Sequence, residues 1–218
     1  MIENTALRQR DHAYSNFTEK LLARDLHPGQ IVSQRELVEL TGMPLGAIRE
    51  MIPRLEADGL IKTVPKRGLQ VLSIDLDLVR NAFQLRGIIE GKAIAEFCKT
   101  AASDEIEKLD RQHSDIRDEA EKGVSPEVLH SAQLIDWAFH DRIIDAMNNS
   151  IISDIHRVNA IKIRLIRNND TRMLPELVVS VLDEHLAIIA ALKNRDDSAA
   201  TKAIHAHINS AKRRALGI

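Results

Sequence analysis

The sequence predicts a mainly α-helical protein of two domains, in which a small domain of helices and one β-hairpin precedes an all-helical bundle. Three observations support this fold class. Aromatic residues make up only 3% of the 218 residues, so the core must consist mostly of aliphatic side chains, which suits packed helices. Runs of β-prone residues occur only between residues 60 and 73. After residue 74, apolar residues recur at helical spacing, so the expected domains are residues 1–74 and 75–218.

The N-terminal domain is expected to place three helices before the hairpin. The first ends at the break made by Pro28 and Gly29. Ser33 and Glu36 have the spacing of a capping box, which starts the second helix, and Gly59 ends the third. The three expected ranges are 3–24, 34–42 and 43–58.

A β-hairpin is predicted over residues 60–73, with a turn made by Pro65, Lys66, Arg67 and Gly68. The order helix, helix–turn–helix, hairpin is that of a winged helix-turn-helix, whose recognition helix enters the major groove of DNA. Two cations at the hairpin tip can meet phosphates, and glycine permits close approach. An isolated turn of this sequence would be interpreted as a solvated loop, but its place after a helix–turn–helix favours DNA contact.

Five segments of this domain carry a resemblance to a known family: Leu26 to Gln30, Ser33 to Leu37, Ile48 to Glu50, Arg54 to Ile61, and Pro65 to Gly68. In order and spacing they resemble the GntR family of bacterial regulators. The resemblance implies that Arg35, Arg49 and the Arg67-Gly68 tip contact DNA. At the start of the recognition helix the family usually has Ser-Arg-Thr-Pro, whereas this chain has Pro44-Leu45-Gly46-Ala47, so its operator should differ from the common one. Pro53 is expected to bend that helix.

Polar residues stand on the predicted apolar faces of three C-terminal helices. Asp136 and His140 lie one helical turn apart, and His185 and His207 each lie on the apolar stripe of a later helix. Burying four such groups separately is costly, whereas a shared divalent metal would satisfy them all. Zinc is the first expectation, with nickel, manganese and iron as alternatives, because three nitrogens and one oxygen suit each of them. Any one of these histidines taken alone would be interpreted as a satisfied core residue. The expected helices cover residues 75–98, 104–121, 126–147, 151–168, 176–193 and 197–213.

The same residues carry a second resemblance. The segment from Asp136 to His140, the pair Glu184-His185, and Ala200, Ala203 and His207 on the last helix are similar to the FCD domain, the effector-binding domain of the FadR branch of GntR regulators. Arg86 and Glu90 also match an arginine and a glutamate of its first helix. The resemblance implies that the four residues bind a metal, and six helices indicate its shorter, VanR-type subgroup.

These patterns together predict a ligand-responsive repressor or activator that is not an enzyme. A homodimer is expected on a palindromic double-stranded DNA operator, because one helix–turn–helix makes few contacts. Arg86 is a candidate anchor for a small carboxylate effector at the metal. An internal pair between Arg86 and Glu90 is an equally good interpretation. A metal-dependent hydrolase and a regulator with a purely structural metal remain alternatives, although no HExxH or nucleophile motif occurs.

Composition narrows the class of protein further. The net charge of −2 excludes a uniformly basic nucleic-acid binder, yet Lys62, Lys66 and Arg67 are clustered where phosphate contact is expected. The single cysteine, Cys98, excludes a disulfide framework. No apolar run is long enough to span a membrane, and the N-terminus lacks a signal-peptide core, so a cytoplasmic protein is expected.

Overall fold

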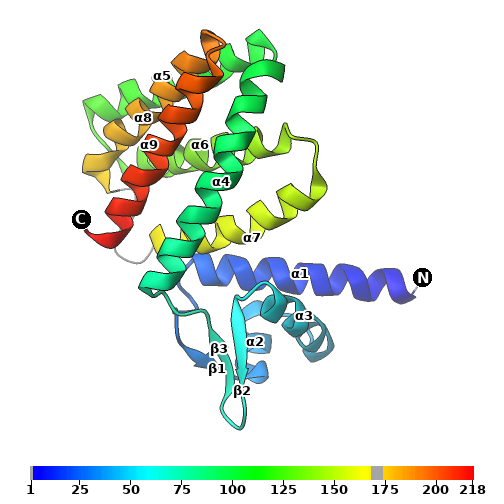
Figure 1. The fold of residues 1–218 in the computed structure, drawn as a ribbon. Helices are drawn as coiled ribbons and strands as arrows, with labels where there is room; N and C mark the ends of the chain where they lie inside the picture. The colour runs from blue at the N-terminus through cyan, green and yellow to red at the C-terminus, as the bar shows by residue number, and fades with distance from the viewer. Residues whose placement is uncertain (1, 168–173) are drawn as a thin grey trace. The chain divides into compact units, whose positions relative to one another are not determined.

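The computed structural model describes the backbone of residues 2–167 and 174–218 (Figure 1). The chain divides into two compact units, residues 1–75 and residues 76–218. The predicted fold class is confirmed: the described residues are mainly helical, with one small antiparallel sheet in the first unit. No described helix is long and apolar enough to cross a lipid bilayer.

The first unit has the element order of a winged helix-turn-helix. Ser33 and Glu36 form the predicted capping box at the start of the second helix, which ends at Gly42 in a left-handed conformation with a φ of 67°. A two-residue strand before this helix was not expected, and it pairs with the second hairpin strand to give the order β1-β3-β2. The elements are α1 (Ile2–Leu22), β1 (Ile31–Val32), α2 (Gln34–Thr41), α3 (Leu45–Ala57), β2 (Ile61–Val64) and β3 (Gly68–Val71).

Apolar side chains on one face of each helix hold this unit together. Phe17 of α1, Leu37 of α2 and Leu55 of α3 are fully buried. Burial of such side chains contributes roughly 1.5–3 kcal/mol each, so the three helices are fixed on one another. The recognition helix α3 runs as one helix through Pro53.

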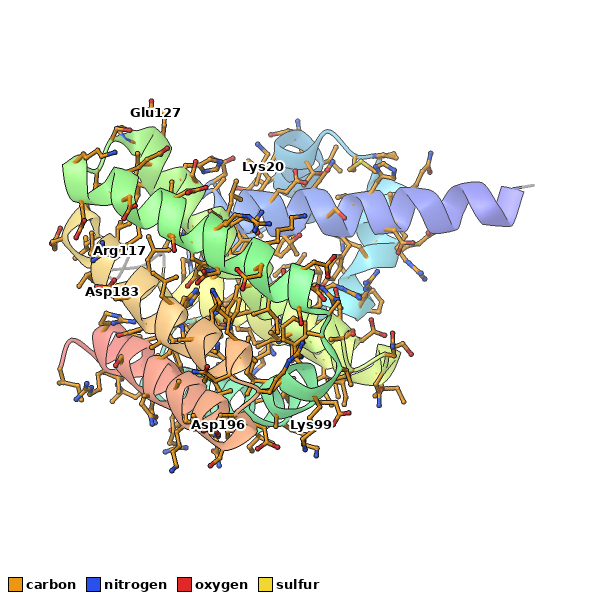
Figure 2. All side chains as sticks on the ribbon, turned by 90° about the horizontal axis from the view of Figure 1, so that it is seen from above. Lys20, Lys99, Arg117, Glu127, Asp183 and Asp196 are labelled. Carbon is orange, nitrogen blue, oxygen red and sulfur yellow. The ribbon has the colours of Figure 1, made fainter. Side chains whose placement is uncertain are left out.

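Over its described residues, the second unit contains the six helices that the sequence predicted, and a 3₁₀ turn (Pro175–Leu177) precedes the fifth. Position 168 of the expected fourth helix lies outside the described residues. Helix α4 packs along α9, α5 packs along α8, and α8 lies beside α9 (Figure 1). Arg117 on α5 donates to Asp183 on α8 at the surface, 2.8 Å apart (Figure 2). The helices are α4 (Leu76–Thr100), α5 (Ser103–Lys122), α6 (Pro126–Asp145), α7 (Ser150–Arg167), α8 (Val178–Lys193) and α9 (Asp197–Leu216).

Candidate metal centre

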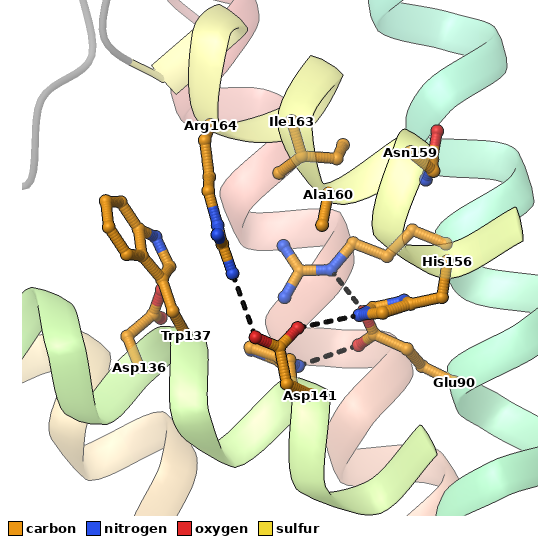
Figure 3. Close-up of a pocket in the computed structure, with 11 residues that line it drawn as sticks. Glu90, Asp136, Trp137, Asp141, His156, Asn159, Ala160, Ile163 and Arg164 are labelled. Carbon is orange, nitrogen blue, oxygen red and sulfur yellow. Dashed lines mark hydrogen bonds and ion pairs between the residues drawn. The ribbon is translucent and has the colours of Figure 1, made fainter. Parts of the chain in front are cut away.

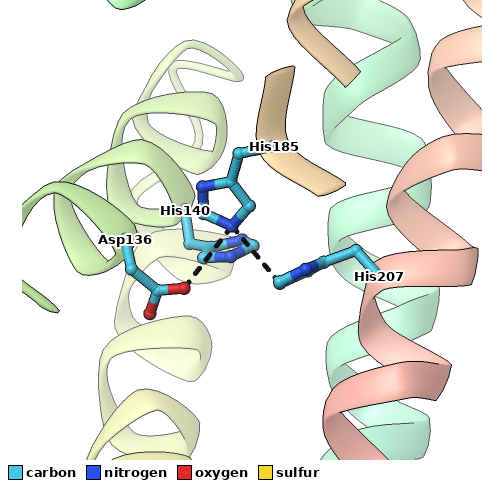
Figure 4. A group of neighbouring side chains, drawn as sticks. All are labelled: Asp136, His140, His185 and His207. Atoms are coloured by element: carbon cyan, nitrogen blue, oxygen red, sulfur yellow. Dashed lines mark hydrogen bonds and ion pairs between the residues drawn. The ribbon is translucent and has the colours of Figure 1, made fainter. Parts of the chain in front are cut away.

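Three helices of the second unit bring four potential metal ligands together. Asp136 and His140 come from α6, His185 from α8 and His207 from α9, and all four side chains are buried (Figure 4). One ligand atom of each residue lies within 4.8 Å of those of the other three. We call these four residues the donor cluster. The apolar stripes identified in the sequence therefore do converge.

The outer nitrogens of two cluster histidines face carboxylates. The Nδ1 of His207 donates to Oε2 of Glu184 at 2.7 Å, and Arg214 donates to both oxygens of that carboxylate at 3.0 and 3.1 Å. The Nδ1 of His140 lies 2.8 Å from Oε2 of Glu90, an ion-pair distance, although the N–H direction departs from that of a hydrogen bond. Carboxylates behind metal-binding histidines orient the ring and fix its tautomer.

A fourth histidine, His113 of α5, contacts the ring of the remaining cluster histidine, His185. Its Nδ1 lies 2.7 Å from the carbonyl oxygen of Leu109 and must donate to it, because a carbonyl only accepts. Burial lowers the pKa of His113, so the ring is neutral and its Nε2 is an acceptor. That Nε2 lies 3.2 Å from Nδ1 of His185, which therefore donates. His113 was not expected at this site, although it stands in the apolar series of Ile106, Leu109 and Ile116.

These outer contacts leave lone pairs at the centre of the cluster. With Nδ1 protonated, His185 and His207 direct unprotonated Nε2 atoms at each other, 3.4 Å apart, and no proton remains for a hydrogen bond between them. Oδ1 of Asp136 is also 3.4 Å from the Nε2 of His185. The buried Nε2 of His140 has no hydrogen-bond partner among the described residues. A cation at this point could bind the three imidazole nitrogens and an oxygen of Asp136, so the donor set fits a divalent metal.

The charge states agree with this arrangement. Burial lowers the pKa of His140 to about 4, with Arg86 adding to the effect, and burial also lowers the pKa values of His185 and His207. Burial alone would raise the pKa of Glu90, but Arg86 and His140 outweigh it and lower that pKa to about 2. Neutral imidazoles backed by ionised carboxylates are the form in which histidine binds metals.

Arg86, the expected effector anchor, is 4% exposed. Its Nε donates to Oε1 of Glu90 at 2.8 Å, so the internal pair considered from the sequence is present. The buried Nη1 of Arg86 nevertheless has no hydrogen-bond partner among the described residues. The guanidinium therefore keeps one donor for another group.

A pocket of about 330 Å³ adjoins the donor cluster (Figure 3). It lies between α4, α6 and α7, and Asp136, His140 and Arg86 are among its lining residues. On the α7 side, Asp141 accepts from Arg164 at 3.0 Å and lies 3.1 Å from Nε2 of His156. Two residues of the donor cluster and the free donor of Arg86 thus share one concave space, which is the usual form of a small-molecule site.

The charged residues expected to contact DNA are exposed on the first unit. Arg35 pairs with Glu39 of its own helix at 3.2 Å, and Nε of Arg49 on α3 donates to Gln34 on α2 at 3.2 Å. Lys66 and Arg67 occupy the turn between β2 and β3 and are exposed.

Gly68 is required by the backbone. Its φ is 121°, and a Cβ there would lie 2.8 Å from the carbonyl oxygen of Val32. The role expected from the sequence was close approach to DNA. The structure adds a close approach to the neighbouring strand β1.

Comparison with known proteins gives the family of both units. Residues 9–71 match the bacterial regulatory proteins of the gntR family, and residues 81–210 match the FCD domain. The chain is 24% identical over 193 residues to the HTH-type regulator LgoR of Escherichia coli, covering 87% of this chain and 62% of that relative's length.

Solved structures share the fold. A GntR-type regulator from a Rhodococcus species superposes with a TM-score of 0.73 at 18% identity, covering 96% of this chain and 98% of its own. The metal-free FCD domain of the regulator TM0439 matches 66% of this chain and 96% of its own, with a TM-score of 0.55 and 20% identity. The chain belongs to the GntR family of bacterial transcriptional regulators and carries an FCD domain.

Proposed function

We propose that this regulator binds a palindromic operator as a homodimer and that a small carboxylate at a divalent metal changes its operator affinity. Asp136, His140, His185 and His207 hold the metal in this proposal, and Arg86 binds the carboxylate. The observation that carries it is the set of inward-facing lone pairs beside a pocket that also receives Nη1 of Arg86. We place the chain in the metal-binding, VanR-type subgroup on the same donor set and on its six helices.

The metal would supply positive charge to a carboxylate oxygen, and zinc, nickel, manganese or iron fits the ligand types. The protein's own groups set the position of the guest. Glu90 holds the Nε side of Arg86 and leaves Nη1 for the second carboxylate oxygen. Low exposure of this region strengthens both attractions, because water screens them poorly there.

The arrangement of Glu184 favours this proposal over a metal-dependent hydrolase. A hydrolase would need a general base, and Glu184 is the acidic residue next to the candidate ligand His185 in the sequence. Its carboxylate is occupied by Nδ1 of His207 and by both terminal nitrogens of Arg214. It therefore supports a ligand from behind and is not directed at the pocket between α4, α6 and α7.

The test uses the full-length protein purified without chelator. His185→Ala should lose bound metal and the response to carboxylate while retaining operator binding, because His185 lies in the second unit. His130→Ala, which changes an exposed histidine of α6, is the matched control and should keep both. Metal content by mass spectrometry and operator affinity by fluorescence anisotropy are the measurements.

Calorimetry then separates the alternatives. A carboxylate that binds metal-free and metal-loaded protein equally well would contradict the proposed site. Metal-dependent carboxylate binding with no change in operator affinity would instead support the alternative in which the metal has no regulatory role. Sedimentation should give a dimer at micromolar concentration, and a monomer with and without operator would contradict the dimer.

A further inference from the structure

A second donor without a partner lines the same pocket. The indole Nε1 of Trp137 is buried and has no hydrogen-bond partner among the described residues. Figure 3 shows the indole on the pocket wall beside Arg164, whose guanidinium carbon lies 4.5 Å from the ring centroid. Arg164 is itself held by Asp141, to which its Nη2 donates at 3.0 Å. A buried N–H without an acceptor is unfavourable and is satisfied when a ligand supplies an oxygen.

The charges around the pocket limit the ligand that it accepts. Arg86 is neutralised by Glu90, and Arg164 is neutralised by Asp141. What remains is the divalent metal of the proposed function with one ionised ligand, Asp136, because histidine binds a metal as a neutral imidazole. That leaves one positive charge uncompensated, which a single negative charge on the ligand would balance. A second carboxylate would have no free cation and would be repelled by the buried carboxylates.

The apolar part of the pocket lining is suited to a short hydrocarbon chain of the ligand. Ala160 and Ile163 of α7 contribute apolar surface to a pocket of about 330 Å³. That space includes the opening to solvent, so its enclosed part has room only for a small guest.

We propose that the effector is a small monocarboxylate that carries a second, uncharged oxygen, a hydroxyl or a carbonyl, and that Trp137 Nε1–H donates to this oxygen. Arg86 Nη1 and the metal bind the carboxylate at the other end. This inference rests on the proposed function. It goes beyond it by assigning Trp137 as a specificity-determining residue and by excluding dicarboxylates as the preferred class.

The test compares four probes with the same number of carbon atoms: butyrate, 2-hydroxybutyrate, 3-hydroxybutyrate and succinate. Trp137 is the one tryptophan of the chain, so its fluorescence reports on this pocket alone. With metal-loaded full-length protein, at least one hydroxybutyrate should bind about tenfold more tightly than butyrate, the gain expected for one hydrogen bond to a buried donor. Succinate should bind more weakly than that hydroxybutyrate.

Trp137→Phe keeps an aromatic ring beside Arg164 and removes the donor. By calorimetry, this variant should bind butyrate and the hydroxybutyrates with equal affinity. Ile163→Val is the matched control, because it changes the same pocket without changing a donor, and it should shift all four affinities alike. Metal content and thermal unfolding of each variant confirm that the site is intact.

Three results would overturn the inference: equal affinities for butyrate and both hydroxybutyrates, a hydroxyl preference that survives Trp137→Phe, or tighter binding of succinate. Metal-dependent binding of butyrate without any hydroxyl preference would overturn this inference and leave the proposed function standing. Binding that is the same without metal, or no binding by any of the four probes, would overturn both.

Discussion

Each of the three cluster histidines has a different outer partner near its Nδ1. Glu90 faces His140, Glu184 accepts from His207, and His113 accepts from His185. A histidine in place of a carboxylate is the unusual member, because it is neutral and brings no charge to the site. Its value as an acceptor depends on the carbonyl of Leu109, which holds the proton on the far side of the His113 ring.

His113→Phe should therefore weaken metal binding without removing a ligand. Phenylalanine keeps a ring against Phe139, whose centroid lies 5.4 Å from that of His113, but it offers no acceptor to Nδ1 of His185. Loss of such an outer partner lowers metal affinity roughly 10- to 100-fold. Competition with a chromophoric chelator measures the affinity, and His130→Phe on the exposed face of α6 should leave it unchanged. Equal affinities for native protein and His113→Phe would contradict the tautomer argument.

Arg67→Ala should weaken DNA binding about equally for different sequences. Arg67 is exposed in the turn between β2 and β3, where a guanidinium can meet phosphates but reads no base. Losing one phosphate contact lowers the slope of log affinity against log salt by about 1. Anisotropy titrations over a range of salt concentrations give the slope. Lys122→Ala, which removes an exposed cation of α5, is the control and should leave the slope unchanged. An unchanged slope for Arg67→Ala would contradict the expectation that the turn contacts DNA.

The donor cluster could be predicted from helical spacing because each ligand lies on the apolar stripe of its own helix. Asp136 and His140 are four positions apart, and His185 and His207 each interrupt a series of buried aliphatic residues. The outer partners could not be predicted, because Glu90 and His113 belong to other helices and their contacts depend on how the helices cross. Trp137 follows Asp136 in sequence, yet only the packing of α7 reveals that its N–H is buried.

Turns and short strands are less accessible to sequence analysis than helices. The six helices of the second unit are marked by apolar spacing and by cap residues such as Ser125 and Asp196. Strand β1 has two residues, too few for any periodicity, and exists because Ile31 and Val32 pair with Gln70 and Leu69 of β3. Its presence gives Gly68 a role that the turn sequence alone does not indicate.

Gly68→Ala should destabilise the sheet of the first unit. Its φ of 121° disfavours any side chain, and the new Cβ would lie 2.8 Å from the backbone oxygen of Val32, which cannot rotate away. The expected loss is more than about 1 kcal/mol, measured by urea unfolding. Gly46→Ala in α3 is the control, because a Cβ there meets nothing within 4 Å, and it should leave stability unchanged or raise it. Similar effects of the two substitutions would contradict the close contact with β1.

The two units carry different chemistry: exposed cations in residues 1–75 and a buried donor cluster in residues 76–218. If the carboxylate of the proposed function changes operator affinity, the carboxylate and the operator must each change the other's binding free energy by the same amount. A carboxylate that bound the DNA-competent and incompetent states equally would shift nothing, however tightly it bound. The size of regulation is therefore set by the difference between two affinities.

Thermodynamic linkage turns this into a test that needs no assumption about how the units are arranged. If saturating carboxylate lowers operator affinity by a given factor, saturating operator must lower carboxylate affinity by the same factor, and factors of about 5 to 150 are typical. Trp137 fluorescence gives the carboxylate affinity with operator duplex or with a scrambled duplex of equal length, and anisotropy gives the operator affinity with and without carboxylate. Equal factors, absent with the scrambled duplex, are expected. A carboxylate that releases the operator while the operator leaves Trp137 titrations unchanged would mean that the carboxylate acts at another site.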